Sequence, residues 1–166
     1  MGCGKSTIGK ELSRDKQLTL IDTDSLIESQ EQRSISDIFA SEGEEYFRQL
    51  ETQTLECLLA QCPGNHIIST GGGIIMRPEN REILQQLGFV VWLNATVDTL
   101  YQRICHCTGR PLLQTENPKA TLTDIISNRL NHYKETADLC IDTDNLHIHE
   151  ISFGILESAK LFIPRR

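Results

Sequence analysis

The apolar residues of the chain switch repeatedly between helical spacing and short continuous runs. Helical spacing and boundary residues predict helices at residues 6–12, 35–62, 78–88, 96–106, a stretch ending near 136, and 151–161. Short apolar runs predict strands at residues 18–22 and in NHIIST, FVVWLN and DLCIDT. Strands that alternate with helices in this way are typical of α/β proteins. We therefore predict an open parallel sheet with helices on both faces.

Several residues and one long stretch mark the boundaries of these elements. Ser25 and Glu28 have the spacing of a capping box, which predicts that a helix starts there. Pro78 suits the first turn of a helix and Gly88 suits its end. The polar stretch CHCTGRPLLQTENPKA then interrupts the alternation. Loops that long inside a compact domain are usually functional.

Composition indicates one globular domain spanning residues 1–166. The chain is 39% hydrophobic and 23% charged, which is ordinary for such a domain. Its formal net charge of -7 argues against a nucleic-acid partner, so local cations must hold any small anionic ligand. No apolar run approaches the length of a membrane span, and the start lacks the pattern of a secretory signal. We expect a cytoplasmic protein with no membrane partner.

Cysteine and histidine spacing does not predict a metal centre. The six cysteines match no disulfide framework, so we interpret them as free thiols. Cys105, His106 and Cys107 lack the spacers of zinc sites, and no second pair follows. His147 and His149 fit the edge of the last predicted helix better than a ligand set.

The opening letters MGCGKSTIGK contain the second half of a phosphate-binding loop, G-x-x-x-x-G-K-[ST], without its first glycine. Backbone N–H groups at a helix N-terminus favour phosphate oxygens. The residues that would offer them are Gly2, Cys3, Gly4, Lys5, Ser6 and Thr7. Lys5 would neutralise the β- and γ-phosphates, and the Ser6 hydroxyl would coordinate Mg²⁺. The alternative is a glycine-rich helix start with a solvated lysine.

Further candidates follow the next two predicted strands. Asp22 and Asp24 are spaced so that one can face a metal and the other a second ligand, although Asp24 also suits a helix cap. Gly71, Gly72 and Gly73 would let a substrate approach bare backbone amides, or form a flexible turn.

Three arginines each have a functional and an ordinary structural interpretation when considered alone. Arg48 could bind a carboxylate, or pair on its own helix with Glu44 or Glu51. Arg110 and Arg129 could be ordinary surface residues.

Taken together, the order of the motifs is more specific. The Gly-x-Gly-Lys-Ser-Thr segment is followed by DTDSLIE, SISDIFASEGEEYFRQLE, STGGG, GRPLL and NRLNHYKETA. This order resembles shikimate kinase, a small relative of the nucleoside monophosphate kinases, from Gly2 to about Asp144. The resemblance implies a P-loop kinase fold with a substrate-binding helical region at about residues 24–62 and a lid at about residues 105–120.

The resemblance also implies an activity and roles for the candidate residues. The reaction would be phosphorylation of the shikimate 3-hydroxyl by ATP and Mg²⁺, on the route to chorismate and the aromatic amino acids. Catalytic roles fall on Lys5, Asp24 and Arg110. The substrate would contact Asp24, Arg48, Gly71, Gly72, Gly73 and Arg129, with Glu51 orienting Arg48. Asp22 would hold Mg²⁺ through water beside Ser6, and Arg103 would lie near adenine. Members are usually monomers.

The chain departs from the family in two places. After CIDTD it continues Asn145-Leu146-His147 where an arginine and a proline are common, which leaves the adenine contacts open. An apolar strand and the start of the P-loop, which members have before Gly2, are missing. Losing about four buried apolar side chains would cost about 6–12 kcal/mol, against a total stability of about 5–15 kcal/mol. We therefore hypothesise that Met1 is an internal start and that the natural protein begins upstream.

Two other functions remain as alternatives. Gluconate kinase shares the phosphate loop, but it does not account for DTD, the Arg48 context and the triple glycine occurring together. A non-catalytic or truncated remnant, acting as a binding module, is favoured by the missing strand.

Overall fold

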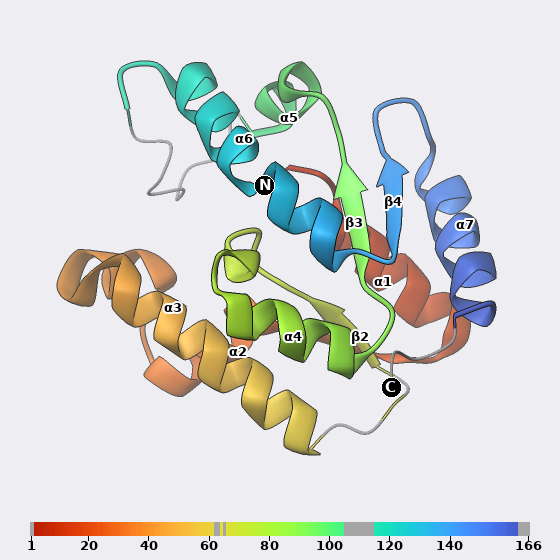
Figure 1. The fold of residues 1–166 in the computed structure, drawn as a ribbon, viewed down its shortest axis with the longest axis horizontal. Helices are drawn as coiled ribbons and strands as arrows, with labels where there is room; N and C mark the ends of the chain where they lie inside the picture. Colours follow the sequence, from red (N-terminus) through yellow and green to blue (C-terminus); the bar gives the residue numbers. More distant parts are fainter. Residues whose placement is uncertain (1, 62–63, 65, 105–114, 163–166) are drawn as a thin grey trace.

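The computed structural model describes residues 2–61, 64, 66–104 and 115–162 (Figure 1). Its helices are α1 (Lys5–Lys16), α2 (Thr23–Glu31), α3 (Ile35–Gln61), α4 (Pro78–Leu87), α5 (Val97–Ile104), α6 (Pro118–Thr136) and α7 (Ile148–Lys160), with a short 3₁₀ helix η1 (Ile74–Met76). Its strands are β1 (Thr19–Asp22), β2 (His66–Ser69), β3 (Val91–Asn94) and β4 (Leu139–Asp142). Helices and strands alternate in the predicted order.

The strands form two parallel pairs rather than one continuous sheet. β1 pairs with β2, and β3 pairs with β4, each in parallel register along its whole length. The predicted parallel α/β arrangement is confirmed. Within the described residues, however, no ladder joins β2 to β3.

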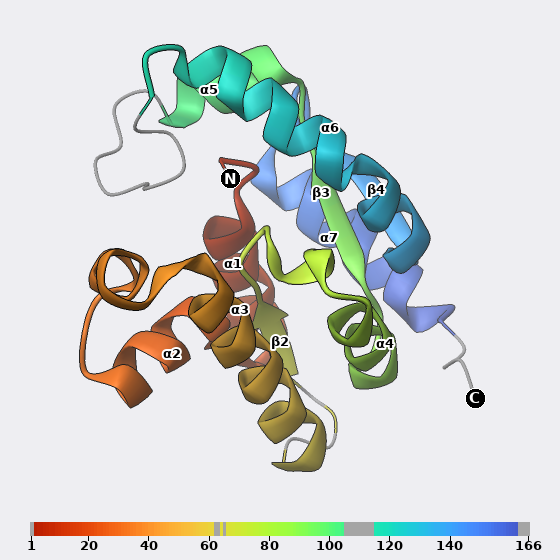
Figure 2. The same ribbon diagram turned by 60° about the vertical axis from the view of Figure 1, so that its left-hand side comes forward.

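Helices cover both faces of the strands, as predicted (Figures 1 and 2). On one face, α1 and α7 contribute a buried cluster of Ile8, Leu12, Ile151 and Ile155, which packs against strands of both pairs. On the other face, α3, η1, α4 and α6 meet around Leu55, Ile74 and Ile75. Burying each such side chain stabilises the fold by about 1.5–3 kcal/mol. These helices, rather than strand pairing, hold the two pairs together.

Several predicted boundaries are confirmed and one is wrong. Pro78 begins α4, and the backbone N–H of Gly88 bonds the Leu84 carbonyl at its end. The capping box of Ser25 and Glu28 does not form, because α2 already begins at Thr23. A Glu28 oxygen instead accepts from the Ile35 N–H at 2.9 Å, where α3 begins.

The outer helices differ from the predicted ranges. α1 runs to Lys16 instead of ending at residue 12. α7 begins at Ile148, before the predicted residue 151, because the His147 N–H donates to the Glu150 carboxylate in its first turn at 2.7 Å. The interpretation of His147 and His149 as helix-edge residues is confirmed.

Arg110 and the segment 105–107 lie outside the described residues, as does most of the predicted lid. Among the helices that the structure describes, none has the length and apolar character needed to cross a membrane.

Candidate active site

The segment leading into α1 has the backbone of an anion-binding turn. Gly2 and Gly4 have φ values of 71° and 88°, the left-handed region that favours glycine. A Cβ at Gly2 would lie 2.8 Å from Ile104 Cγ2, so packing also demands glycine there. No side chain caps the first turn of α1. Its N–H groups therefore remain available to an anion, at the positive end of the helix dipole.

Two side chains of this turn have different surroundings. Cys3 is buried with Leu100 and Ile104 of α5, which anchors the turn. The Lys5 ammonium lies 3.7 Å from Cys3 Sγ. Burial raises the pKa of Asp24 and the charge of Lys5 opposes that shift, so this cation lies close to the end of β1.

Asp22, the last residue of β1, and Asp24, in the first turn of α2, have different surroundings. An Asp22 oxygen accepts from the N–H groups of Asp24 and Ser25 at 3.1 and 3.3 Å and so caps α2. The cap predicted as an alternative for Asp24 therefore belongs to Asp22. Burial and the Asp22 charge raise the pKa of Asp24. Asp24 Oδ1 is buried without a hydrogen-bond partner among the described residues.

Arg48 is buried on α3 between two carboxylates of its own helix. Its guanidinium donates to Glu51 Oε2 at 2.6 Å and to Glu44 Oε1 at 2.8 Å. Both predicted helix partners are thus present. Glu51 is fully buried, which raises the pKa of its carboxyl, while the Arg48 charge opposes the shift.

The triple glycine that follows β2 lies directly against these side chains. A Cβ at Gly71 would come within 2.9 Å of both Asp24 Oδ1 and Glu51 Oε1. A Cβ at Gly73 would overlap the Arg48 guanidinium. Like Asp24 Oδ1, Glu51 Oε1 is buried and has no hydrogen-bond partner in the described part of the chain. Two unsatisfied acceptors therefore face the same spot above Gly71, which suits a ligand hydroxyl.

Arg129 of α6 also lies near these side chains. It is buried, at 8% exposure, so the surface alternative is wrong. Burial raises the pKa values of Glu51 and Tyr133, and the Arg129 charge opposes both shifts, so its guanidinium lies near both side chains.

Tyr133, one helical turn after Arg129, was not predicted from sequence. Its hydroxyl donates to the Gly72 carbonyl at 2.6 Å, and its ring stacks on Trp92 with centroids 5.5 Å apart. The i, i+4 spacing of Arg129 and Tyr133 is the only sequence signal that could have found it.

Hydrogen bonds of Arg103 connect the turn before α1 to Thr143, the residue that follows β4. It donates to the Thr143 carbonyl at 2.8 Å, to the Thr143 hydroxyl at 3.2 Å and to the Gly2 carbonyl at 3.5 Å. Ser6 and Thr7 are exposed at the start of α1. Most predicted site residues thus gather at the carboxyl ends of the strands, where ligands of open α/β sheets bind.

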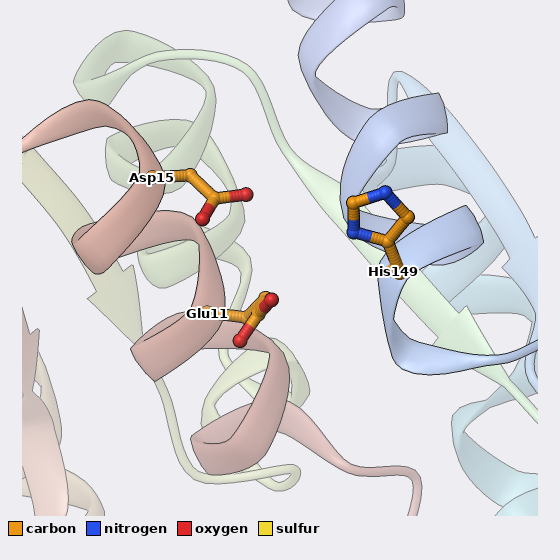
Figure 3. A group of neighbouring side chains, drawn as sticks. All are labelled: Glu11, Asp15 and His149. Carbon is orange, nitrogen blue, oxygen red and sulfur yellow. The ribbon is translucent and has the colours of Figure 1, made fainter.

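A different acidic group lies between α1 and α7 (Figure 3). Oxygen or nitrogen atoms of Glu11, Asp15 and His149 all lie within 4.8 Å of one another. Asp15 and His149 are exposed, and Glu11 already pairs with Arg14. We assign no ion to this group.

Residues 1–160 match the family model described as shikimate kinase. The chain belongs to the shikimate kinase family. It is 40% identical over 160 residues to a shikimate kinase of Marinomonas sp., covering 96% of this chain and 88% of that protein. It is 48% identical over 141 residues to one of Synechococcus elongatus, covering 85% and 72%.

Solved shikimate kinase structures agree. The enzyme from Acinetobacter baumannii, in complex with shikimate, superimposes with a TM-score of 0.89 at 37% identity, covering 95% of this chain and 87% of that one. The enzyme from Bacteroides thetaiotaomicron gives 0.84 at 30% identity, covering 96% and 94%. The predicted family and kinase fold are confirmed, and each of these names favours shikimate kinase over gluconate kinase.

Shikimate kinases use ATP, generally with Mg²⁺, and the residues described here fit both. The uncapped start of α1 and Lys5 offer donors and positive charge to phosphate oxygens. The Ser6 hydroxyl and the Asp22 carboxylate are oxygen ligands of the kind that Mg²⁺ prefers.

Proposed function

We propose that this chain transfers the terminal phosphoryl group of MgATP to the 3-hydroxyl of shikimate, giving shikimate 3-phosphate and ADP for chorismate and aromatic amino acid synthesis. One observation carries the proposal. The buried cation Arg48 lies against Gly73, Asp24 lies against Gly71, and the buried cation Arg129 lies near Glu51, in a member of the shikimate kinase family.

The two arginines would select the carboxylate of the substrate. A guanidinium presents N–H groups in a plane, so it fits a carboxylate better than an ammonium does. Arg48 is held by buried Glu51 on one side and by exposed Glu44 on the other. A substrate carboxylate would displace Glu44, whose side chain is 53% exposed and readily returns to water.

Asp24 would accept the proton of the attacking hydroxyl. Its unpartnered Oδ1 lies above Gly71, and its raised pKa makes it a better proton acceptor than an ordinary aspartate. Lys5, close enough to affect that pKa, would neutralise charge on the transferring phosphoryl group.

The nucleotide side would be held by the turn before α1. The amides of residues 2–7 and Lys5 would hold the phosphates, and Ser6 and Asp22, the latter through water, would hold Mg²⁺. When bound, Mg²⁺ supplies positive charge to the β- and γ-phosphate oxygens. Arg103 would contact adenine, and Arg110 would close over the phosphates from the lid.

The oligomeric state and location belong to the same proposal. We place the chain in the cytoplasm as a monomer, with shikimate as its small-molecule partner and no nucleic acid or membrane. The net charge of -7 supports the absence of a nucleic-acid partner.

The divided sheet favours one second candidate, a non-catalytic module that retains the fold. A coupled assay of ADP release with shikimate, with gluconate and with neither compound separates these functions. Release that depends on shikimate alone is the expected result. Release with gluconate would point to the related kinase, and no release with either compound would point to the module.

A further inference from the structure

The glycine loop, Gly71–Gly73, continues directly into η1, and the two are hydrogen-bonded to each other. The Ile74 N–H donates to the Gly71 carbonyl at 3.4 Å, and the Met76 N–H donates to the Gly73 carbonyl at 3.0 Å. The first and last glycines of the loop are therefore held by η1. A movement of η1 would carry the loop with it.

On their own, these two bonds hold the loop weakly. A 3₁₀ helix has poorer hydrogen-bond geometry than an α-helix, and glycines lose more conformational freedom on folding than other residues. Burial of Ile74 and Ile75 against α3 and α4 fixes where η1 lies. Apolar contact is non-directional, however, so it does not fix how the carbonyls of η1 are turned.

The first turn of α4 supplies directed bonds to these carbonyls. Asn80 Nδ2 donates to the Ile74 carbonyl at 2.9 Å. The adjacent Arg81 donates from Nη1 to the Ile75 carbonyl at 2.9 Å and to the Met76 carbonyl at 3.4 Å. Every carbonyl of η1 thus accepts from a side chain of α4, which fixes η1 in orientation as well as in place.

The surroundings of Asn80 indicate that the fold uses its donor rather than its bulk. Asn80 is fully buried, and its Oδ1 has no hydrogen-bond partner among the described residues. A buried acceptor without a partner costs stability, and leucine, with the same branched shape, would carry no such acceptor. The amide is therefore unfavourable for packing alone, whereas its Nδ2 makes a bond that leucine cannot make.

Both ends of the glycine loop contact residues of the candidate active site. Gly73 lies against the Arg48 guanidinium, and Gly71 lies against Asp24 Oδ1, so closely that neither glycine has room for a Cβ. A small shift of η1 would therefore change the space between the loop and these two side chains. Because Asn80 is fully buried, its effect on a ligand passes through the backbone of η1.

We propose that Asn80 and Arg81 are positioning residues of the substrate site, which hold the glycine loop against Arg48 and Asp24 through the carbonyls of η1. Asn80 is the more important of the two, because its bond is fully buried. The effect on shikimate rests on the proposed function. The hold on η1 is measurable without any substrate.

Substitutions in α4 test the effect on the substrate. Asn80→Leu should raise the KM for shikimate about two- to tenfold, the equivalent of one neutral hydrogen bond, and leave the KM for ATP unchanged. Arg81→Met, at a partly exposed position, should raise the KM for shikimate about two- to threefold. Arg81→Lys keeps a donor and should stay close to the parent. The two Arg81 variants decide the question if circular dichroism shows that Asn80→Leu is unfolded.

Hydrogen exchange, followed residue by residue by NMR without ligand, measures the hold on η1. The amides of Ile74 and Met76 should exchange about three- to tenfold faster in Asn80→Leu, and also faster in Arg81→Met, because η1 opens locally more often. Amides of α7, which packs on the other face of the strands, serve as internal references.

Ser13→Ala is the matched control. It removes a hydroxyl that donates to the Leu18 carbonyl at 2.5 Å, just before β1 begins and at the opposite end of that strand from the candidate site. This variant should change neither KM value, nor the exchange of the η1 amides.

The positioning role requires a higher KM for shikimate and faster exchange of the η1 amides in the same variant. Either change without the other, or a rise of both KM values in proportion to lost stability, would overturn it. If the parent releases no ADP with shikimate, the proposed function fails, and the exchange of the η1 amides then decides alone whether α4 holds the loop.

Discussion

The guanidinium of Arg48 lies against the backbone of Gly73 so closely that a Cβ on Gly73 would overlap both of its terminal nitrogens. The Arg48 guanidinium can therefore lie here only because Gly73 has no side chain. Arg48 is held from the other side by Glu51, which is fully buried, so it has no room to retreat.

Gly73→Ala should displace Arg48 and raise the KM for shikimate, with little change in the KM for ATP. Steady-state kinetics with each substrate varied in turn measures the effect. Gly154→Ala is the matched control, because the nearest atom to its added Cβ is Ile141 Cδ1 at an ordinary 3.8 Å. Equal effects of the two substitutions would show that Gly73 is only a packing position.

Arg48→Lys should also raise the KM for shikimate while leaving ATP affinity unchanged. An ammonium cannot present the planar pair of donors that Arg48 offers. Losing a charged hydrogen bond costs about 1.5–3 kcal/mol, or about 10- to 150-fold in KM. Arg33→Lys, in a partly exposed ion pair with Glu31, is the control. Unchanged kinetics for Arg48→Lys would remove Arg48 from the substrate site.

Lys5→Ala should lower kcat by orders of magnitude, because Lys5 is placed to neutralise charge on the transferring phosphoryl group. Lys10→Ala, at an exposed position of the same helix, should leave kcat unchanged. Single-turnover measurement of phosphoryl transfer separates the chemical step from product release. An active Lys5→Ala enzyme would refute the phosphate role.

Asp24 should make both activity and stability depend on pH. Burial and the Asp22 charge raise its pKa above the ordinary 3.8, so the folded chain retains a proton that the unfolded chain has already lost. The folded state therefore binds more protons in this window, and Asp24's contribution to stability falls as pH rises from 3.8 through the folded pKa.

Asp24→Asn should then unfold at a higher urea concentration than the parent at neutral pH, with the difference shrinking as pH falls through the folded pKa and lost below 3.8. The same variant should lose activity, because an amide cannot accept the hydroxyl proton. Urea unfolding at several pH values, followed by circular dichroism, measures the first effect. A variant less stable than the parent at neutral pH would contradict the assigned direction of the pKa shift.

Tyr133→Phe should raise the KM for shikimate about two- to tenfold, the equivalent of one neutral hydrogen bond of about 0.5–1.5 kcal/mol. The substitution removes the bond to the Gly72 carbonyl and keeps the ring that stacks on Trp92. Tyr46→Phe, whose hydroxyl donates to Glu31, controls for the loss of a hydroxyl elsewhere. If only stability changes, and equally in both variants, Tyr133 does not position the glycine loop for substrate.

Local sequence patterns predicted the element order, because helical periodicity and strand-end motifs are read within a few residues. They also marked candidate residues, but only the resemblance to a family combined these residues into one site. Arg48 with Glu44 and Glu51 is such a case, since all three lie on one helix. The helix cap at Asp22 was missed because Ser25 offered a competing signal only a few residues away.

Contacts between distant segments could not be predicted in the same way. The Tyr133 hydroxyl meets Gly72 only after α6 has packed beside η1, and no local pattern records that meeting. The burial of Arg129 is a consequence of the same packing.

The cluster around Ile27, Ile38, Phe47 and Leu50 consists of neighbours in sequence from α2 and α3. Contacts of short sequence separation close small loops and form early in folding. α2 and α3, the helices that form this cluster and carry Arg48, should therefore fold before the strands associate. Slow association of the strands would then delay formation of the turn before α1, at a time when α2 and α3 are already folded.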